Sequence, residues 1–214
     1  MTKIIAIDGP ASVGKSTLAK RLSKRLKAPV LYSGKLYRAV ALEIIKQKIN
    51  IGSTKEILKC VNYINLDNLK SKELYSSEVD NISSIISAKK KLRNKLIKFQ
   101  RSFPKKYGND VKFAIIEGRD IGTIIFPGAD YKIFLWAASE IRAKRRYEQL
   151  RKNGKNVKYS KIYREINVRD QKDMTRKIAP LMPAANSVLL DTSYIDIEQA
   201  FNAIKNIILK TKTV

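Results

Sequence analysis

The sequence carries, directly after a short apolar run, the stretch Gly9-Pro10-Ala11-Ser12-Val13-Gly14-Lys15-Ser16. It fits the pattern G-x-x-x-x-G-K-[ST] at every defined position. Glycines let backbone N–H groups crowd an anion, and the positive end of the following helix points at the same anion. The lysine of such a loop reaches the outer phosphates of a nucleotide, and the hydroxyl can meet a magnesium shell. The stretch therefore predicts a phosphate-binding loop; the alternative is a glycine-rich turn without a ligand.

Apolar patterns on both sides of the loop alternate between two periods. Short β-rich runs predict strands, and apolar residues at helical spacing predict helices. The expected strands are Lys3–Asp8, Val30–Tyr32, Val111–Glu117, Lys132–Trp136 and Ser187–Leu190. The expected helices are Lys15–Leu26, Lys35–Gln47, a basic helix that Ser139 caps and Gly154 ends, Ser160–Lys172 and Asp196–Leu209. This alternation predicts an α/β fold with a parallel sheet flanked by helices on both faces.

Residues from about 50 to 108 lack this regularity. The segment is rich in Lys, Ser and Asn, is weakly periodic and holds only short helical patches. Because it follows the second expected strand, we interpret it as part of a peripheral lobe inserted into the core. The predicted division is a core of residues 1–35 and 109–214 and a lobe of residues 36–108.

The charge of the chain is strongly positive, with 44 Lys and Arg against 19 Asp and Glu and a formal net charge of +25. A polyanionic partner such as nucleic acid is one explanation. The other is a solvated basic surface together with an anionic substrate. We favour the second, because the lysines are scattered and no nucleic-acid motif accompanies them.

Several classes of chemistry are excluded by composition. The chain has no histidine and a single cysteine, Cys60. These counts exclude histidine-based triads, His-ligated zinc and an internal disulfide. No apolar run approaches the roughly 20 residues of a membrane-spanning helix. The N-terminus lacks the apolar region of a signal peptide, so we expect a cytoplasmic protein without a membrane partner. Separately, we expect a monomer.

Arginines recur along the chain in compact groups. Transfer between two phosphorylated molecules brings several negative charges together, and guanidinium groups neutralise and align them without proton chemistry. The chain is short for a helicase or a transporter, and it lacks the N-K-x-D signal of GTPases. These features favour a small-molecule kinase. The arginines concerned are Arg38, Arg93, Arg119, Arg145, Arg146, Arg169 and Arg176.

Four further stretches are Tyr32-Ser33-Gly34-Lys35-Leu36-Tyr37-Arg38, Glu117-Gly118-Arg119-Asp120-Ile121-Gly122-Thr123, Arg169-Asp170-Gln171-Lys172-Asp173-Met174-Thr175-Arg176 and Ala179-Pro180-Leu181. Together with the phosphate-binding loop they resemble the bacterial cytidylate kinases, nearly from end to end. The combination of G-R-D-x-G-T, R-D-x-x-D-x-x-R and A-P-L is specific to this family among nucleoside monophosphate kinases. The resemblance implies the P-loop kinase fold, with an acceptor-binding lobe and a short mobile lid at residues 145–165.

The same resemblance implies ATP-dependent phosphorylation of CMP and dCMP to the diphosphates. It implies that Arg38 and Arg119 hold the acceptor phosphate and that Asp120 and Arg93 read the cytosine. A carboxylate can accept from the exocyclic amine of cytosine, and an arginine can donate to its ring acceptors. The alternative for Arg38 and for Arg93 is an arginine on a solvated helix face.

The remaining acceptor residues follow from the same stretches. Asp173 matches the family's pentose-binding aspartate, and Arg169 matches the arginine shared across these kinases. Arg176 resembles the further arginine near the acceptor and the transferred phosphoryl group. The alternative for these three is a ladder of exposed salt bridges on one helix. The full CMP-binding set implied is Ser33, Arg38, Ser84, Arg93, Arg119, Asp120, Arg169, Asp173 and Arg176. The family's lobe insert looks shortened here between Leu66 and Glu78.

The ATP side is implied by the loop and the lid. ATP-binding residues are the loop itself with Thr17, and Arg145 and Arg146 where the lid begins. Catalytic charge stabilisation is expected from Lys15, Arg119, Arg169 and Arg176. Mg²⁺ is the expected cofactor, bound with ATP, and Ser16 is its candidate contact, although the family often has glycine at this position.

Two alternatives stay open from the sequence. The first is another P-loop kinase that acts on UMP, AMP or a non-nucleotide acceptor. The second is a basic nucleic-acid-binding ATPase, which predicts ATPase stimulation by DNA or RNA with a steep salt dependence. The sequence shows no aromatic stacking cluster and no helicase motif, which counts against the second alternative.

Overall fold

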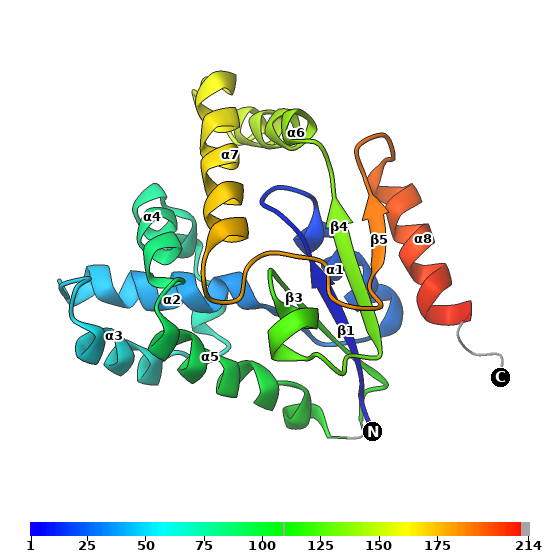
Figure 1. Ribbon diagram of the computed structural model, residues 1–214, viewed down its shortest axis with the longest axis horizontal. Helices are drawn as coiled ribbons and strands as arrows, with labels where there is room; N and C mark the ends of the chain where they lie inside the picture. Colours follow the sequence, from blue (N-terminus) through cyan, green and yellow to red (C-terminus); the bar gives the residue numbers. More distant parts are fainter. Residues whose placement is uncertain (109, 211–214) are drawn as a thin grey trace. The chain divides into compact units, whose positions relative to one another are not determined.

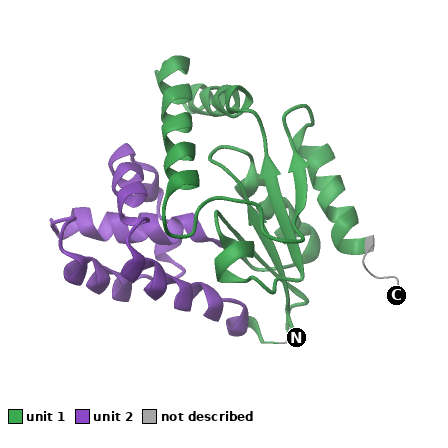
Figure 2. Cartoon of the chain, in the orientation of Figure 1, with its two compact units in different colours: residues 1–30, 107–214 green, residues 31–106 purple. Residues whose placement is uncertain are grey.

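The computed structural model describes residues 1–108 and 110–210, and it divides into two compact units (Figure 2). Unit 1 comprises residues 1–30 and 107–214, and unit 2 comprises residues 31–106. The divisions predicted from the sequence fall after residues 35 and 108. Asn109 and residues 211–214, which were predicted to belong to the core, lie outside the described residues.

A five-stranded sheet runs in the order β2-β3-β1-β4-β5, and the pairs β1–β3, β1–β4 and β4–β5 are parallel. The strands are β1 (Lys3–Asp8), β2 (Val30–Tyr32), β3 (Phe113–Gly118), β4 (Tyr131–Trp136) and β5 (Val188–Asp191). All five predicted strands exist, and their ends lie within two residues of the expected ones. The predicted parallel α/β fold is thus confirmed.

The central strand β1 is the point where the topology reverses. β3 pairs with one side of β1, and β4, the next strand along the chain, pairs with the other side. Such a reversal opens a crevice outside the carboxyl ends of a parallel sheet, where ligands bind. In register, Asp8 at the end of β1 pairs with Gly118 of β3, so these two carboxyl ends are level. The predicted phosphate-binding loop begins at this edge.

Helix α1 (Lys15–Leu26) packs against the sheet and against α8 (Ile197–Lys210), and helices make up most of the second unit (Figure 1). The other α-helices are α2 (Ser33–Lys46), α3 (Thr54–Cys60), α4 (Ser77–Ile86), α5 (Lys90–Ser102), α6 (Ser139–Lys152) and α7 (Tyr159–Thr175). Short 3₁₀ turns are η1 (Val61–Tyr63), η2 (Asn68–Lys70), η3 (Lys72–Tyr75) and η4 (Pro104–Tyr107). A π-helical turn, η5, spans Ile121–Ile125.

The core of unit 1 lies around β1 and β3, which are buried on both faces as central parallel strands require. Ile5, Ile7 and Ile115 are fully buried or nearly so. Helix α1 adds Leu18 and Leu22 from one stripe and packs against β3 and α8. Each such side chain contributes roughly 1.5–3 kcal/mol by leaving water. This packing holds the N-terminus of α1 at the carboxyl edge of the sheet.

Unit 2 has a helical core of its own. Helix α2 packs against α4, and α3 packs against α5. Their apolar stripes bury Leu36, Ile57, Ile86 and Leu92, with Leu74 of η3 beside them. Where the sequence analysis noted a shortened insert, the chain forms the turns η2 and η3.

One local prediction was wrong. Ser139 is the first residue of α6, and the N-cap is Ala138, whose carbonyl accepts the first helical bond from the Arg142 N–H at 3.1 Å. The Ser139 hydroxyl instead donates to Glu140 Oε2 at 3.2 Å. The Ala138 N–H donates to Ser193 Oγ at 3.0 Å, which ties this N-cap to the segment after β5.

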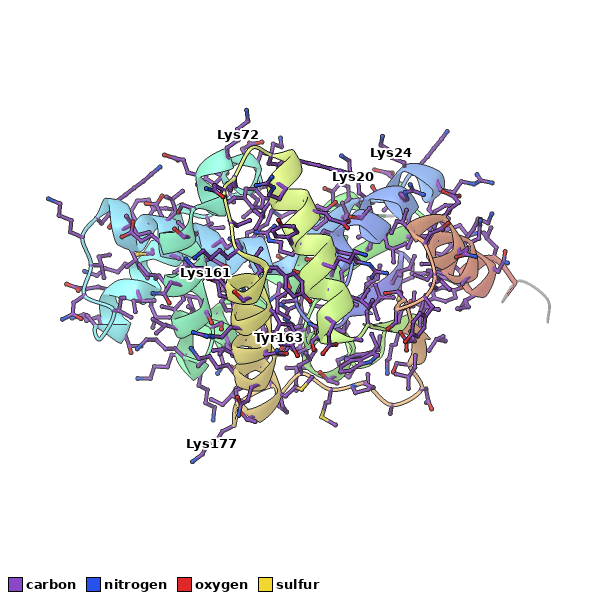
Figure 3. All side chains as sticks on the ribbon, turned by 90° about the horizontal axis from the view of Figure 1, so that it is seen from above. Lys20, Lys24, Lys72, Lys161, Tyr163 and Lys177 are labelled. Carbon is purple, nitrogen blue, oxygen red and sulfur yellow. The ribbon has the colours of Figure 1, made fainter. Side chains whose placement is uncertain are left out.

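The positive charge is distributed over the exposed surface. In Figure 3 the side chains of Lys24, Lys72 and Lys177 project away from the ribbon, and all three are exposed. Separately, across residues 1–108 and 110–210 no helix combines the length and the apolarity that crossing a membrane requires.

Candidate active site

The loop between β1 and α1 depends on two glycines. Gly9 has φ +148°, and a Cβ there would lie 2.4 Å from the Leu135 carbonyl oxygen, so a larger residue would clash with backbone. Gly14, at φ +101°, is the N-cap of α1, and the first turn of α1 has no acidic residue. No carboxylate of the first turn itself therefore offsets the partial positive charge at this helix end. The loop is suited to an anion.

Lys15 is buried beside this loop, with only 7% of its surface exposed. Its ammonium donates to the carbonyl oxygens of Gly9, at 2.8 Å, and of Pro10, at 2.7 Å. Burial lowers the pKa of Lys15 to about 7, and nearby Arg119 adds to this lowering. Glu117 and other carboxylates oppose it. The negative charge of an incoming phosphate would strongly stabilise the ammonium form of a lysine in this position.

A hydroxyl and a carboxylate meet at the start of α1. Ser16 Oγ donates to Glu117 Oε2 at 3.0 Å. Glu117, near the end of β3, is 7% exposed, whereas Ser16 is exposed. Hydroxyl and carboxylate oxygens are the hard donors that Mg²⁺ prefers, with water and phosphate completing its shell.

The loop that follows β3 is held by Asp8. Its two carboxylate oxygens accept from the backbone N–H groups of Ile121, at 2.8 Å, and Gly122, at 2.7 Å. Burial raises the pKa of Asp8 to about 6; those two N–H groups lower it, and the charge of Asp120 raises it. Asp120 is itself 6% exposed. The Asp8 carboxylate therefore positions the backbone around Asp120.

Arg119, Asp173 and Arg176 form a buried charge network. Arg119 Nε donates to Asp173 Oδ2 at 2.8 Å, and Arg119 Nη1 donates to the Gly9 carbonyl at 2.7 Å. Arg176 donates to Asp173 Oδ1 at 3.4 Å and to the Ala179 carbonyl at 2.6 Å. The network thus ties α7 to the phosphate-binding loop.

The protonation of Asp173 is set by this network. Burial alone would raise the pKa of Asp173, but Arg119, Arg176 and Arg169 together hold it below its ordinary value. Asp173 is 9% exposed, so the alternative of an exposed salt-bridge ladder on α7 is wrong for this residue. Six of the predicted site residues thus lie in unit 1: Lys15, Arg119, Asp120, Arg169, Asp173 and Arg176.

Arg145 and Arg146 of α6, where the lid was predicted to begin, differ in their surroundings. Arg145 donates to Thr192 Oγ1 at 3.2 Å and contacts the Ile195 carbonyl at 3.5 Å, which joins α6 to the segment after β5. Arg146 is exposed and donates to Gln149 Oε1 at 2.8 Å.

The predicted acceptor residues of unit 2 form a separate group. Arg93 is only 2% exposed, donates to the Ser87 carbonyl at 3.0 Å, and lies 5.6 Å from the centre of the Tyr37 ring. The alternative of a solvated helix arginine is therefore wrong for Arg93. Ser33 is buried, while Ser84 is half-buried on α4.

Arg38 lies on α2 in the same unit. It donates to the Leu74 carbonyl at 2.8 Å and forms an ion pair with Asp80. Its guanidinium carbon also lies 5.8 Å from the centre of the Tyr75 ring. These contacts hold the side chain in a defined orientation, against the alternative of a freely solvated arginine.

The sequence matches the profile of the family described as Cytidylate kinase over residues 5–210. The chain belongs to the cytidylate kinase family. A curated cytidylate kinase from Rhodospirillum rubrum is 38% identical over 205 residues, which cover 96% of each chain. Another, from Fusobacterium nucleatum, is 38% identical over 221 residues and 98% of each chain.

Solved structures share the fold of this cytidylate kinase family member at low identity. An uncharacterized protein from Eubacterium ventriosum has a TM-score of 0.55 at 15% identity, covering 97% of this chain and 98% of that one. TT1252 from Thermus thermophilus has a TM-score of 0.51 at 15% identity, covering 100% and 99%. This likeness concerns the fold alone.

Among the described residues of this family member, four buried charged residues were not sequence-predicted site residues: Asp8, Glu117, Arg142 and Asp170. For Asp8 and Glu117 a signal existed, because each ends an apolar run that predicts a strand of the parallel sheet. Arg142 and Asp170 form an ion pair across 28 positions of sequence, on two helices rich in other charges. No local pattern marks that pair.

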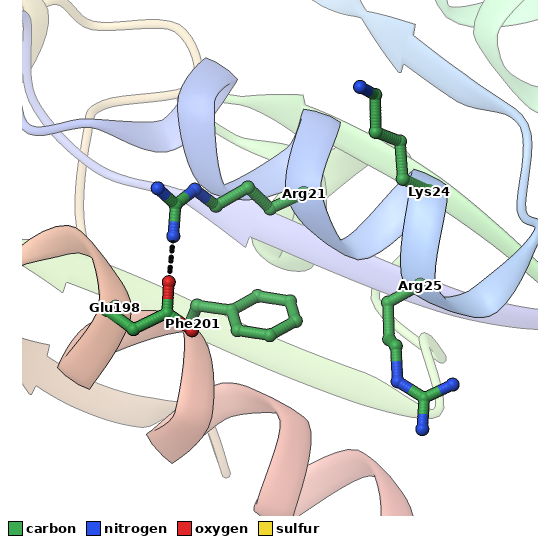
Figure 4. Close-up of a pocket in the computed structure, with 5 residues that line it drawn as sticks. All are labelled: Arg21, Lys24, Arg25, Glu198 and Phe201. Atoms are coloured by element: carbon green, nitrogen blue, oxygen red, sulfur yellow. Dashed lines mark hydrogen bonds and ion pairs between the residues drawn. The ribbon is translucent and has the colours of Figure 1, made fainter.

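A shallow hollow of about 430 Å³ lies elsewhere on this family member, between α1 and α8 (Figure 4). An ion pair between Arg21 and Glu198 crosses it. Arg21 is six residues along α1 from Lys15, which at 1.5 Å per residue is about 9 Å. None of the residues of the phosphate-binding loop lines the hollow. The hollow is therefore not part of the candidate site, which lies at the carboxyl ends of the strands. The hollow is lined by Arg21, Lys24, Arg25, Glu198 and Phe201.

Proposed function

We propose that the chain transfers the terminal phosphoryl group of ATP to CMP, and also to dCMP, yielding ADP and the nucleoside diphosphate. The observation that carries this proposal is the buried Lys15 in its glycine loop, tied through Gly9 to the network of Arg119 and Asp173. A loop for one phosphate chain beside a guanidinium network for another suits two anionic substrates. Membership of the cytidylate kinase family supports CMP as the acceptor.

The residues would act by position and charge. A CMP phosphate oxygen is already anionic near neutral pH, so attack on ATP needs no protein base. Lys15 and the N-terminal amides of α1 would bind the donor phosphates, while Arg119, Arg169 and Arg176 would neutralise charge between donor and acceptor. Fixed charges of this kind stabilise a phosphoryl transition state without reorganising during the reaction.

Magnesium is the proposed cofactor, and the oxygens of Ser16 and Glu117 fit it. Mg²⁺ in such enzymes keeps several waters and is bound through one or two protein oxygens together with substrate phosphates. When bound, the ion supplies charge neutralisation on the phosphates of the donor. Ser16 would meet its shell, and Glu117 would orient the Ser16 hydroxyl.

Recognition of the acceptor is proposed for the residues that membership of the family implies. Asp120 would accept from the exocyclic amine of cytosine, and Arg93 would donate to the ring. Asp120 and Arg93 are both buried, and a base with the reversed pattern of donors and acceptors would make neither of these hydrogen bonds. Arg38, Ser33 and Ser84 complete the acceptor set, with Asp173 on the pentose. Arg145 and Arg146 are assigned to the ATP side.

Initial rates of ADP release with CMP, dCMP, UMP and AMP would test the proposal. We expect a strong preference for CMP. Asp120→Ala should reduce the ratio of kcat/KM for CMP over UMP by about 10²-fold or more while KM for ATP changes little. Lys15→Ala should lower kcat by about 10²- to 10³-fold. Equal rates on CMP and UMP would overturn the acceptor assignment.

The working form is proposed to be a cytoplasmic monomer. Light scattering on the purified chain would test its oligomeric state. ADP release that requires DNA or RNA instead of CMP would favour the nucleic-acid-dependent ATPase over the kinase.

A further inference from the structure

Among the described side chains, a deeply buried ion pair joins Arg142 of α6 to Asp170 of α7. Their side chains are 3% and 8% exposed. Helices α6 and α7 pack together over a small apolar cluster of Ala143, Ile162 and Ile166, so the pair fastens an already packed helix hairpin. Figure 1 shows these two helices beside each other.

Both members of the pair also bind one residue of the phosphate-binding loop. The Ala11 N–H donates to Asp170 Oδ1 at 3.2 Å, and Arg142 Nη1 donates to the Ala11 carbonyl at 3.1 Å. Arg142 Nε further donates to the Ala137 carbonyl, just after β4, at 2.7 Å. The backbone donor and the backbone acceptor of Ala11 are thus both held by side chains from α6 and α7.

This contact extends a pattern along the loop. The Gly9 carbonyl accepts from Lys15 and Arg119, and the Pro10 carbonyl accepts from Lys15. With Arg142 on Ala11, three successive carbonyl oxygens each accept a hydrogen bond from a lysine or arginine side chain. Each donor offsets part of the negative dipole of its carbonyl group. This reduces the repulsion between these oxygens and an incoming phosphate.

The backbone beside Ala11 is strained. Ser12 has φ +59°, a left-handed conformation that non-glycine residues rarely adopt. Such conformations persist only where neighbouring contacts over-determine them. The two hydrogen bonds to Ala11 supply that restraint one residue before Ser12.

A role in stability alone explains the pair poorly. Removing two charges from water opposes folding, and apolar side chains of similar volume often replace buried ion pairs without loss of stability. An apolar pair could hold α6 to α7 but could not bind the N–H and the carbonyl of Ala11. Unlike an apolar pair, the charged pair holds both backbone groups of Ala11 and so fixes the conformation of the loop there.

We propose that Arg142 and Asp170 form a positioning clasp that holds the phosphate-binding loop in its nucleotide-binding shape and joins it to the α6–α7 hairpin. The clasp touches Ala11 and acts on nucleotide binding through the loop. It rests on the proposed role of that loop in ATP binding. Losing it lets the strained backbone at Ser12 relax, which lowers affinity for the nucleotide and leaves acceptor affinity nearly unchanged.

The test replaces both charges together, as Arg142→Met with Asp170→Leu, in the full chain. We expect KM for MgATP and the Kd for MgADP to rise about 10- to 100-fold, with a smaller fall in kcat. KM for CMP should stay within about threefold, and the thermal midpoint should stay close to that of the wild type. A control, Arg21→Met with Glu198→Gln, removes an exposed pair of the same unit and should leave all these values unchanged.

Asp170→Asn is the second variant, in case the double replacement does not fold. It keeps an acceptor for the Ala11 N–H but leaves Arg142 without its counter-charge, so its KM for MgATP should lie between the wild type and the double variant. Unchanged nucleotide affinity in both variants, or a loss of stability with unchanged KM, would overturn the clasp. Lys15→Ala separates the two proposals: if it too leaves MgADP binding intact, the role of the loop fails and the clasp fails with it.

Discussion

Arg119 Nε donates to Asp173 Oδ2 across 2.8 Å, and these two residues lie 54 positions apart in sequence. The contact joins the loop after β3 to the last turns of α7, and the other end of the guanidinium reaches the phosphate-binding loop at Gly9. An arginine that already has one carboxylate and one carbonyl as partners is held in place before any substrate arrives. Such preorganisation reduces the entropy lost on binding an anion.

Asp173→Asn should destabilise the protein and weaken CMP turnover. Removing one partner of a buried charge network leaves Arg119 and Arg176 uncompensated, which costs about 3–5 kcal/mol of unfolding free energy. The pKa of Asp173 is depressed, so its stabilising contribution is present above the ordinary value of 3.8 and is lost as pH falls below it. Urea unfolding between pH 3 and 7 measures this.

The same unfolding series carries its own control. Asp67→Asn removes a fully exposed carboxylate paired with Lys70 and should leave the unfolding curve nearly unchanged. If the wild type and Asp173→Asn lost stability in parallel as the solution is acidified, the network would not be the source of the effect.

Nucleotide binding should take up a proton through Lys15. The pKa of Lys15 is lowered to about 7 by burial and by Arg119, so the side chain is largely neutral at pH 8 in the free protein. A bound phosphate chain favours the ammonium form and raises that pKa. Titration calorimetry with MgADP in buffers of different ionisation enthalpy should therefore show uptake of close to one proton at pH 8 and little at pH 6.

Lys15→Arg is the matched variant for that measurement, because an arginine does not titrate in this range. Its residual binding should show no proton uptake at pH 8. Equal uptake by the wild type and this variant would assign the proton to another group.

Glu117→Gln should raise the magnesium concentration needed for half-maximal activity by about 10- to 100-fold, the usual effect of losing a residue that orients a metal contact. The amide keeps the size of the side chain but weakens its hold on the Ser16 hydroxyl. Activity measured against Mg²⁺ at fixed ATP reports the change. A variant with the wild-type magnesium curve and a lower kcat would place Glu117 in another role.

Asp8 should titrate near pH 6 in the folded protein. Burial, and then the charge of Asp120, raise its pKa to about 6 against the two backbone N–H groups that favour the ionised form. Because the folded-state pKa lies above the ordinary 3.8, the stabilising contribution is complete below pH 3.8 and is lost as pH rises through 6. The wild type should therefore lose about 2–3 kcal/mol relative to Asp8→Asn between pH 4 and pH 7.

Carbon-13 NMR of the Asp8 carboxyl group gives a direct check. A titration midpoint below pH 4 would show that the two N–H bonds outweigh burial. The pH dependence of the unfolding free energy at this residue would then reverse in sign.

Local residue patterns were sufficient for the elements that hold the loop. Helix α1 was predicted at its observed bounds, Lys15–Leu26, because its apolar residues repeat at helical spacing behind a glycine loop. The five strands were also predicted, because β-rich apolar runs of this length match a strand and are too short for a buried helix. These predictions depend only on residues that are close together in the chain, and the sequence gives their order directly.

The sequence by itself thus determined the parallel α/β fold and the membership of a family, and it predicts the phosphate-binding loop. Only the tertiary structure decided that Asp8 holds the loop around Asp120, that Arg93 is buried, and that Arg142 and Asp170 bind the two backbone groups of Ala11. The physical reason is that burial and charge pairing arise where segments far apart in the chain pack together. Arg142 and Asp170 resemble the solvated charges around them until α6 and α7 close over Ala11 and exclude water.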